Sequence, residues 1–213
     1  MMAEDKKINY QIKLDETIKS LTESGRVPTL FLHACCAPCS SYVLEYLSLY
    51  FKITVFFYNP NIYPREEYDH RASEIAGFVK RFPAVNEIKL ISSEQFEERF
   101  YDAVKGFENL GEGTERCYKC YEMRLAETAR MASDLGFDYF TTTLSISPMK
   151  NAAWLNEIGG RLSAEYGIAY LYSDFKKRNG FKRSTELSAE YGLYRQDYCG
   201  CVYSFREAHD GRR

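Results

Sequence analysis

The chain has 213 residues, of which 45 % are hydrophobic and 27 % are charged. Such a length and composition are typical of one folded domain and exclude a mostly disordered chain. No apolar run approaches the roughly 18 residues of a membrane span, and the N-terminus lacks the apolar segment of a secretory signal. We therefore expect a cytoplasmic protein without a membrane partner.

The net charge is only −2, so the molecule as a whole has no field that favours nucleic acid. The charge is uneven, however, because residues 174–213 carry nine basic and six acidic side chains, whereas residues 1–173 have a net charge of −5. The basic C-terminal segment indicates a polyanionic partner, and a solvated surface is the ordinary alternative.

Helical and strand patterns alternate along the chain, with Gly or Pro at most boundaries. Helices are expected over residues 12–24, 38–50, 64–81, 93–104, 118–135 and 148–166, and strands over residues 29–33, 53–58, 87–91, 138–144 and 168–172. This alternation predicts an α/β fold, namely a Rossmann-like three-layer fold with a central parallel sheet of about five strands. We expect a single domain over residues 1–213, with the strand-poor segment 174–213 folding back over the rim of the active site.

Ligands of such folds bind beyond the carboxyl ends of the strands. Four loops follow predicted strands there, over residues 34–39, 58–64, 145–151 and 174–177. The topology predicts that these loops converge on one site.

Seven cysteines form three clusters, and in a reducing cytoplasm clustered cysteines are more often metal-binding or catalytic than disulfide-bonded. Cys117 and Cys120 form a CxxC at the start of a helix, where the backbone amides favour thiolates. Cys35 and Cys36 follow the first strand and add two more thiols. These four thiols suit an iron–sulfur cluster or zinc, with thiol redox chemistry and a structural role as alternatives.

Cys199 and Cys201 form a separate pair, and the intervening Gly200 allows both sulfurs to face one partner. Such a pair forms a strained disulfide or chelates a metal, unless it is an incidental surface turn. Cys39 is left over by this count, either as a spare ligand or as a small buried residue.

Two further residues lie at predicted strand ends. Three roles are open for His33, namely a proton donor, a partner of a metal ligand, and a core residue bonded to a carbonyl. Asp174 is a metal-binding carboxylate, a proton-handling group or a helix N-cap.

The segment after Asp174 combines cations with aromatic rings. The residues concerned are Lys176, Lys177, Arg178, Lys182, Arg183, Tyr191, Tyr194, Arg195 and Tyr198. This mixture suits a single-stranded RNA loop, because cations bind phosphates and rings stack on bases. A solvated face is the alternative.

Six sequence blocks, in this order, resemble the QueH family of epoxyqueuosine reductases. They are His33–Cys39, Tyr58–Ile62, Arg116–Leu125, Thr142–Pro148, Asp174–Lys177 and Tyr194–Cys201, and the matching region runs from about residue 29 to residue 204. The resemblance implies the last step of queuosine synthesis, in which the epoxide oxygen is removed from epoxyqueuosine at the wobble position of tRNAs with GUN anticodons. It also implies an adenine-nucleotide-hydrolase-like fold and an electron donor that the sequence does not identify.

The resemblance further implies a [4Fe-4S] cluster ligated by Cys35, Cys36, Cys117 and Cys120. Cys199 and Cys201 then become a redox-active pair, joined by a disulfide when oxidised, or ligands of one additional iron. Asp174 is the expected oxygen ligand of that iron. Two other classes stay open, namely a zinc-stabilised RNA-binding module without turnover and a metal-free dithiol oxidoreductase.

Overall fold

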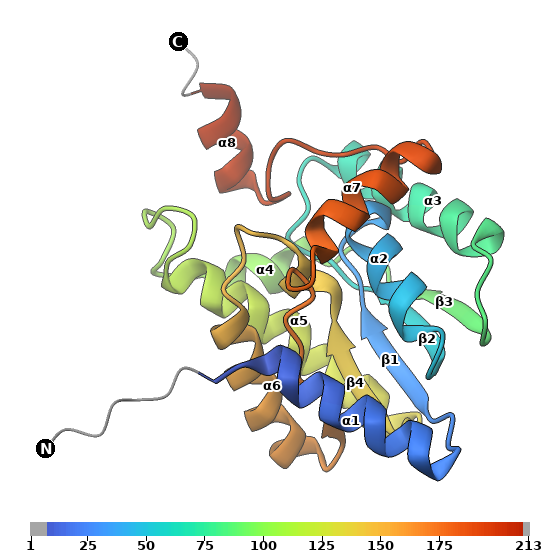
Figure 1. Cartoon of the computed structure of the whole chain (residues 1–213). Coiled ribbons are helices and arrows are strands. Elements are labelled where there is room, and N and C mark those ends of the chain that lie inside the picture. The colour runs from blue at the N-terminus through green and yellow to red at the C-terminus, as the bar shows by residue number, and fades with distance from the viewer. Residues whose placement is uncertain (1–7, 211–213) are drawn as a thin grey trace, which may run out of the picture.

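The computed structural model describes residues 8–210, and it has helices on both faces of a five-stranded parallel sheet (Figure 1). The strands are β1 (Thr29–His33), β2 (Lys52–Phe57), β3 (Ile88–Ser92), β4 (Tyr139–Thr142) and β5 (Ala169–Tyr170). The helices are α1 (Tyr10–Ser24), α2 (Ala37–Leu47), α3 (Arg65–Arg81), α4 (Glu97–Ala103), α5 (Glu115–Asp134), the 3₁₀ helix η1 (Thr143–Ile146), α6 (Ala152–Tyr166), α7 (Gly180–Glu190) and α8 (Val202–Asp210). The predicted three-layer α/β fold is confirmed.

The strand order is β3-β2-β1-β4-β5, and all pairs are parallel. The chain runs outward from β1 through β2 to β3 and then returns to place β4 on the other side of β1. The direction of winding therefore reverses between β1 and β4. Such a switch point leaves a crevice at the carboxyl ends of the two strands.

Alternating side chains of the strands enter two separate cores, as the period of two in a strand requires. Leu30 and Leu32 of β1 pack with α1, α2 and α3 on one face, whereas Phe31 packs with α5 and α6 on the other. Both faces are therefore buried, which explains the nearly continuous apolar runs in these strands. Among the described helices, none is both long and apolar enough to cross a bilayer.

Several element boundaries differ from those expected. The expected helix over 118–135 begins at Glu115 instead, directly after Thr114, whose hydroxyl donates to the Gly111 carbonyl in the preceding turn. Both cysteines of the CxxC therefore lie within the helix. The expected helix over 148–166 begins at Ala152, because the Asn151 side chain accepts from the Ala153 and Trp154 amides.

Three other boundaries are also displaced. The expected strand over 138–144 ends at Thr142, whose hydroxyl accepts from the Leu144 amide and starts η1. The expected strand over 168–172 is reduced to two residues, and the expected helix over 93–104 begins only at Glu97. The Ser93 amide bonds the Phe57 carbonyl at the end of β2 instead.

Gly159 of α6 packs directly against the ring of Tyr170 in β5. A Cβ added there would lie 2.3 Å from Cζ of the buried Tyr170 ring. We expect Gly159→Ala to lower the free energy of unfolding by about 1–3 kcal/mol through overpacking. Gly77→Ala in α3 is the matched control, because its Cβ would meet open space, and it should raise stability by about 0.4–1 kcal/mol. Urea unfolding of both variants measures the difference, and equal shifts would contradict this account of α6 packing.

Candidate active site

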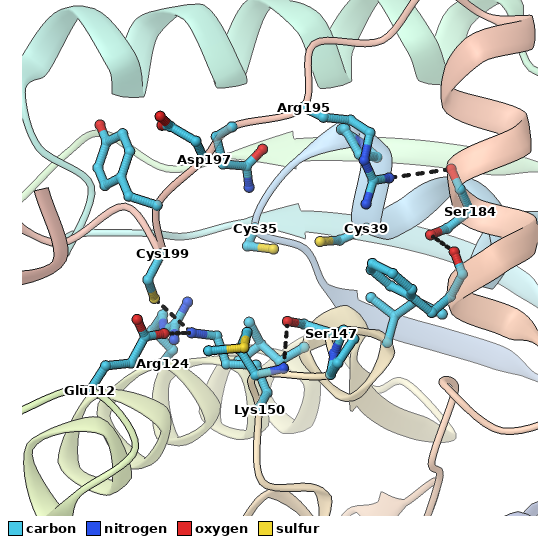
Figure 2. Close-up of a pocket in the computed structure, with 18 residues that line it drawn as sticks. Cys35, Cys39, Glu112, Arg124, Ser147, Lys150, Ser184, Arg195, Asp197 and Cys199 are labelled. Atoms are coloured by element: carbon cyan, nitrogen blue, oxygen red, sulfur yellow. Dashed lines mark hydrogen bonds and ion pairs between the residues drawn. The ribbon is translucent and has the colours of Figure 1, made fainter. Parts of the chain in front are cut away.

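A cavity of about 480 Å³ opens at the switch point between β1 and β4 (Figure 2). Its walls come from the loop after β1, the segment from η1 to Lys150, and the chain from α7 to Cys199. Two of the four loops that were expected to converge, over residues 34–39 and 145–151, line this cavity, because parallel strands end at one edge of the sheet. The loop over residues 58–64 reaches the segment between Cys199 and Cys201 instead, where the Tyr63 amide donates to the Gly200 carbonyl. Residues 174–177 do not line the cavity.

The loop after β1 gathers three thiols. The Sγ atoms of Cys35, Cys36 and Cys39 all lie within 4.8 Å of one another, and those of Cys35 and Cys36 are 3.6 Å apart. Cys36 is the N-cap residue of α2, and Pro38 occupies its first turn, which brings Cys39 back towards the strand end. Sequence reasoning left Cys39 aside by counting ligands, whereas the structure places its sulfur with the other two.

These three thiols share one set of hydrogen bonds. Hydrogen bonds from Cys35 and Cys39 hold the pKa of Cys36 well below its usual value. The positive charge of Arg71 lowers it further, as does Gln196, whose Nε2 lies 3.4 Å from Cys36 Sγ. The bond to Cys36 raises the pKa of Cys35 to about 12, and the bond to Cys35 raises the pKa of Cys39. The group therefore favours a single thiolate, at Cys36.

The other four cysteines form a second group. Cys117, Cys120, Cys199 and Cys201 line a small adjacent cavity together with Phe100 and Tyr121. Gly200 has a φ of 114°, which a residue with a Cβ rarely adopts, and this turn brings Cys199 and Cys201 to the same cavity. The structure thus divides the expected four-cysteine set between two neighbouring groups.

The electrostatics of Cys117 and Cys120 differ from the expectation that a helix N-terminus favours their thiolates. Burial raises the pKa of Cys117, although it accepts from the Gly113 amide at 3.3 Å. Burial also raises the pKa of Cys120 to about 12. Desolvation outweighs the helix dipole here, so these sulfurs ionise only beside a positive partner.

Two buried arginines supply positive charge beside the sulfur groups. Arg124 is 2 % exposed and lines both cavities; its Nε donates to the Cys120 carbonyl at 3.3 Å. Its Nη2 is buried and has no hydrogen-bond partner among the described residues. Arg71 is 1 % exposed, and its Nε donates to Glu67 Oε1 at 2.6 Å. A buried donor without an acceptor, such as Nη2 of Arg124, is rare in protein interiors and points to a missing acceptor.

Cys199 lines both cavities and has a cation at its sulfur. Lys150 Nζ lies 2.7 Å from Cys199 Sγ and 3.2 Å from Glu112 Oε1 (Figure 2). Although burial opposes a charge here, the interactions with Cys199, Tyr121 and Glu112 raise the pKa of Lys150 well above its usual value. Sequence reasoning placed the loop 145–151 at the rim but gave no role to Lys150, Glu112 or Arg124.

His33 is completely buried at the end of β1 and is tied on both sides. Its Nε2 lies 3.1 Å from the Tyr58 carbonyl and its Nδ1 lies 2.9 Å from Thr142 Oγ1. A carbonyl only accepts, so the proton belongs on Nε2 and the threonine hydroxyl donates to Nδ1. Desolvation lowers the pKa of His33 to about 3, which makes it a neutral connector of β1, β2 and β4.

Asp174 is buried, and its carboxylate is bound to Lys176 Nζ at 2.9 Å. It does not line either of the two cavities. Its role as a metal ligand stays a prediction that would require this ion pair to open.

The basic run over residues 176–183, the first part of the segment expected to bind RNA, carries five cations, and most of them form ion pairs within the protein. Lys176 pairs with Asp174, Arg178 with Asp15, Lys182 with Glu186 and Arg183 with Glu45. Four of its five cations thus have carboxylate partners.

The fold and the site define a class of protein: a Rossmann-like α/β protein with a thiol-rich centre suited to a metal or to redox chemistry. Residues 30–207 match the sequence profile of the family described as Epoxyqueuosine reductase QueH. The chain belongs to this family, and it is an oxidoreductase, an epoxyqueuosine reductase of queuosine biosynthesis.

Individual relatives agree with this assignment. The chain is 42 % identical over 205 residues to Epoxyqueuosine reductase QueH of Streptococcus pyogenes serotype M1, covering 95 % of this chain and 80 % of the relative. It is 36 % identical over 185 residues to Epoxyqueuosine reductase QueH of Thermotoga maritima, covering 85 % and 93 %.

A solved structure shares the fold. The U34-tRNA thiolase NcsA from Methanococcus maripaludis, solved with its [4Fe-4S] cluster, superposes with a TM-score of 0.52 at 12 % sequence identity. The match covers 93 % of this chain and 69 % of NcsA.

The low pKa of His33 has a consequence for stability. Below the unfolded-state pKa of 6.5, protonation favours the unfolded chain, because the folded site stays neutral down to a pH of about 3. Between pH 7 and pH 5 the wild type should lose about 2 kcal/mol from this residue. We expect His33→Gln, which cannot be charged, to remove most of this slope in urea unfolding. The same slope in the variant would assign the pH dependence to other groups.

Proposed function

We propose that this chain removes the epoxide oxygen of epoxyqueuosine at the wobble position of tRNAs with GUN anticodons. The observation that carries the proposal is that two clusters of cysteines lie beside one nucleoside-sized cavity, in a chain of the QueH family. Cavities of about 300–1,000 Å³ are typical of small-molecule sites. A tRNA substrate would also place the activity in the cytoplasm.

A [4Fe-4S] cluster is the proposed cofactor, held by Cys35, Cys36, Cys117 and Cys120. The donor set fits, because soft thiolates are the usual ligands of iron–sulfur clusters. Burial raises the pKa of Cys117 and Cys120, and the cationic core of a cluster would stabilise their thiolate forms on binding. The free Nη2 of Arg124 would meet an anionic centre there. NcsA, which shares the fold, was solved with a [4Fe-4S] cluster, and this supports the proposal.

The remaining cysteines give two versions of the site. Cys199 and Cys201 either form a redox pair, which closes to a disulfide, or hold one additional iron. Cys39 is an alternative cluster ligand, since its Sγ atom lies within 4.8 Å of those of Cys35 and Cys36. In the second version Asp174 stays the proposed oxygen ligand of the additional iron, with one carboxylate oxygen bound to Lys176 Nζ.

The reaction breaks both C–O bonds of the epoxide, takes up two electrons and two protons, and releases the oxygen as water. When bound, iron in such a site supplies electrons one at a time or acts as a Lewis acid on the oxygen. Lys150 holds a proton at Nζ on the cavity wall, beside Cys199 and Glu112. We propose that it provides one of the two protons. The electrons come ultimately from a donor of unidentified nature.

Metal content separates this proposal from a zinc-stabilised RNA-binding module and from a metal-free dithiol oxidoreductase. After anaerobic reconstitution with iron and sulfide we expect a brown protein with about four irons and four sulfides, or one iron more. Its visible absorption should bleach on reduction. A colourless protein with stoichiometric zinc, or with no metal, would contradict the cluster.

Serine variants divide the cysteines by role. We expect Cys117→Ser and Cys36→Ser to lose most of the cluster absorption and all turnover of epoxyqueuosine-containing tRNA. Cys199→Ser should keep the absorption but lose turnover at least 100-fold, because its sulfur faces the substrate cavity. Iron and sulfide analysis and nucleoside chromatography are the measurements. Full turnover of Cys199→Ser would refute both versions of the second site.

A further inference from the structure

Three cations line the large cavity, and they differ in their partners. Arg124 is buried behind the sulfurs, and Lys150 is bound to Glu112 and Cys199. Arg195 is exposed, and no carboxylate of residues 8–210 lies within ion-pairing distance of its guanidinium. Arg195 thus differs from the neighbouring basic run, in which four cations are neutralised internally.

The Arg195 side chain is nevertheless held in place. Its Nη1 donates to Ser188 Oγ at 3.1 Å and to the Ser184 carbonyl at 3.5 Å, and its guanidinium lies 5.4 Å from the centre of the Phe181 ring. Figure 2 shows the guanidinium between the Ser184 and Cys39 sides of the cavity, with the Asp197 carboxylate pointing away from it. These neutral contacts orient the guanidinium group of Arg195 without cancelling its charge. The charge therefore stays available to an external anion.

Exposed apolar side chains line the same opening. Met149 is 67 % exposed and Phe181 is 38 % exposed, and both line the cavity. Large apolar side chains at the mouth of a polar site commonly meet a flat ligand surface, such as a nucleic-acid base.

We propose that Arg195 binds a backbone phosphate of the RNA strand next to the nucleotide that enters the cavity, while Phe181 and Met149 contact a flanking base. This inference rests on the proposed function. A nucleotide within an RNA strand brings a phosphate on each side, whereas a free nucleoside brings none. Arg195 is therefore a residue that distinguishes the polymer from the isolated nucleoside, and it is one of the residues of segment 176–198 that the sequence indicated for RNA binding.

The test compares two substrates of the reconstituted enzyme, an anticodon stem-loop RNA carrying epoxyqueuosine and the free epoxyqueuosine nucleoside. For Arg195→Gln we expect KM for the stem-loop to rise about tenfold, and by a factor at least five times larger than for the nucleoside. The slope of log Kd against log salt for the stem-loop, from fluorescence anisotropy, should fall by about 0.7–1, which corresponds to one phosphate.

Matched variants exclude a structural effect. Arg178→Gln removes a cation that is already paired with Asp15 and should leave the salt slope unchanged. Arg195→Lys keeps the charge and should recover most of the affinity. Met149→Ala removes an exposed side chain that contributes little to packing and should weaken stem-loop binding two- to fivefold.

A failure of the proposed function would appear differently, as no turnover of the stem-loop by the wild type. In that case the salt dependence of stem-loop binding would still test Arg195. Equal losses on stem-loop and nucleoside, an unchanged salt slope in Arg195→Gln, or no recovery in Arg195→Lys would each overturn the phosphate contact.

Discussion

The site depends on the balance between buried sulfur and buried guanidinium. Seven cysteines lie at one end of the sheet, and burial by itself favours their neutral, unreactive forms. Arg71 and Arg124, two of the largest fully buried side chains, lie beside them. An arginine without a carboxylate partner is costly in an interior, so the presence of Arg124 is explained best by negative charge on the sulfurs or on what they hold.

The topology makes this arrangement possible. Cys35 follows the first strand, the CxxC lies on α5, and Cys199 follows α7, so the sulfurs come from three distant parts of the chain. The reversal of winding between β1 and β4 opens a crevice, and α5 passes beside it with one buried face. The period of 3.6 places Cys117, Cys120 and Arg124 on that same face. His33, at the end of β1, is hydrogen-bonded to Tyr58 after β2 and to Thr142 of β4.

The fold could be predicted from the sequence because each element is short, periodic and bounded by a residue of defined conformation. The convergence of the loops after β1 and β4 follows from that topology alone. The partners of charged side chains could not be predicted, because they lie far apart in sequence. Arg178 finds Asp15 163 residues away, and Arg183 finds Glu45 138 residues away. The same holds for the proximity of Cys39 to Cys35 and for the burial of Lys150. Both depend on the conformation of loops, which sequence periodicity does not predict.

Cys199 belongs to the walls of both cavities. One sulfur atom therefore borders both the large cavity and the small cavity that Phe100 of α4 and residues of α5 line. A small oxidant or reductant that reaches this sulfur through the large cavity shares its route with the nucleoside. A substrate bound in the large cavity would thus shield this side of the thiol from dioxygen and from solution reductants for as long as it stays.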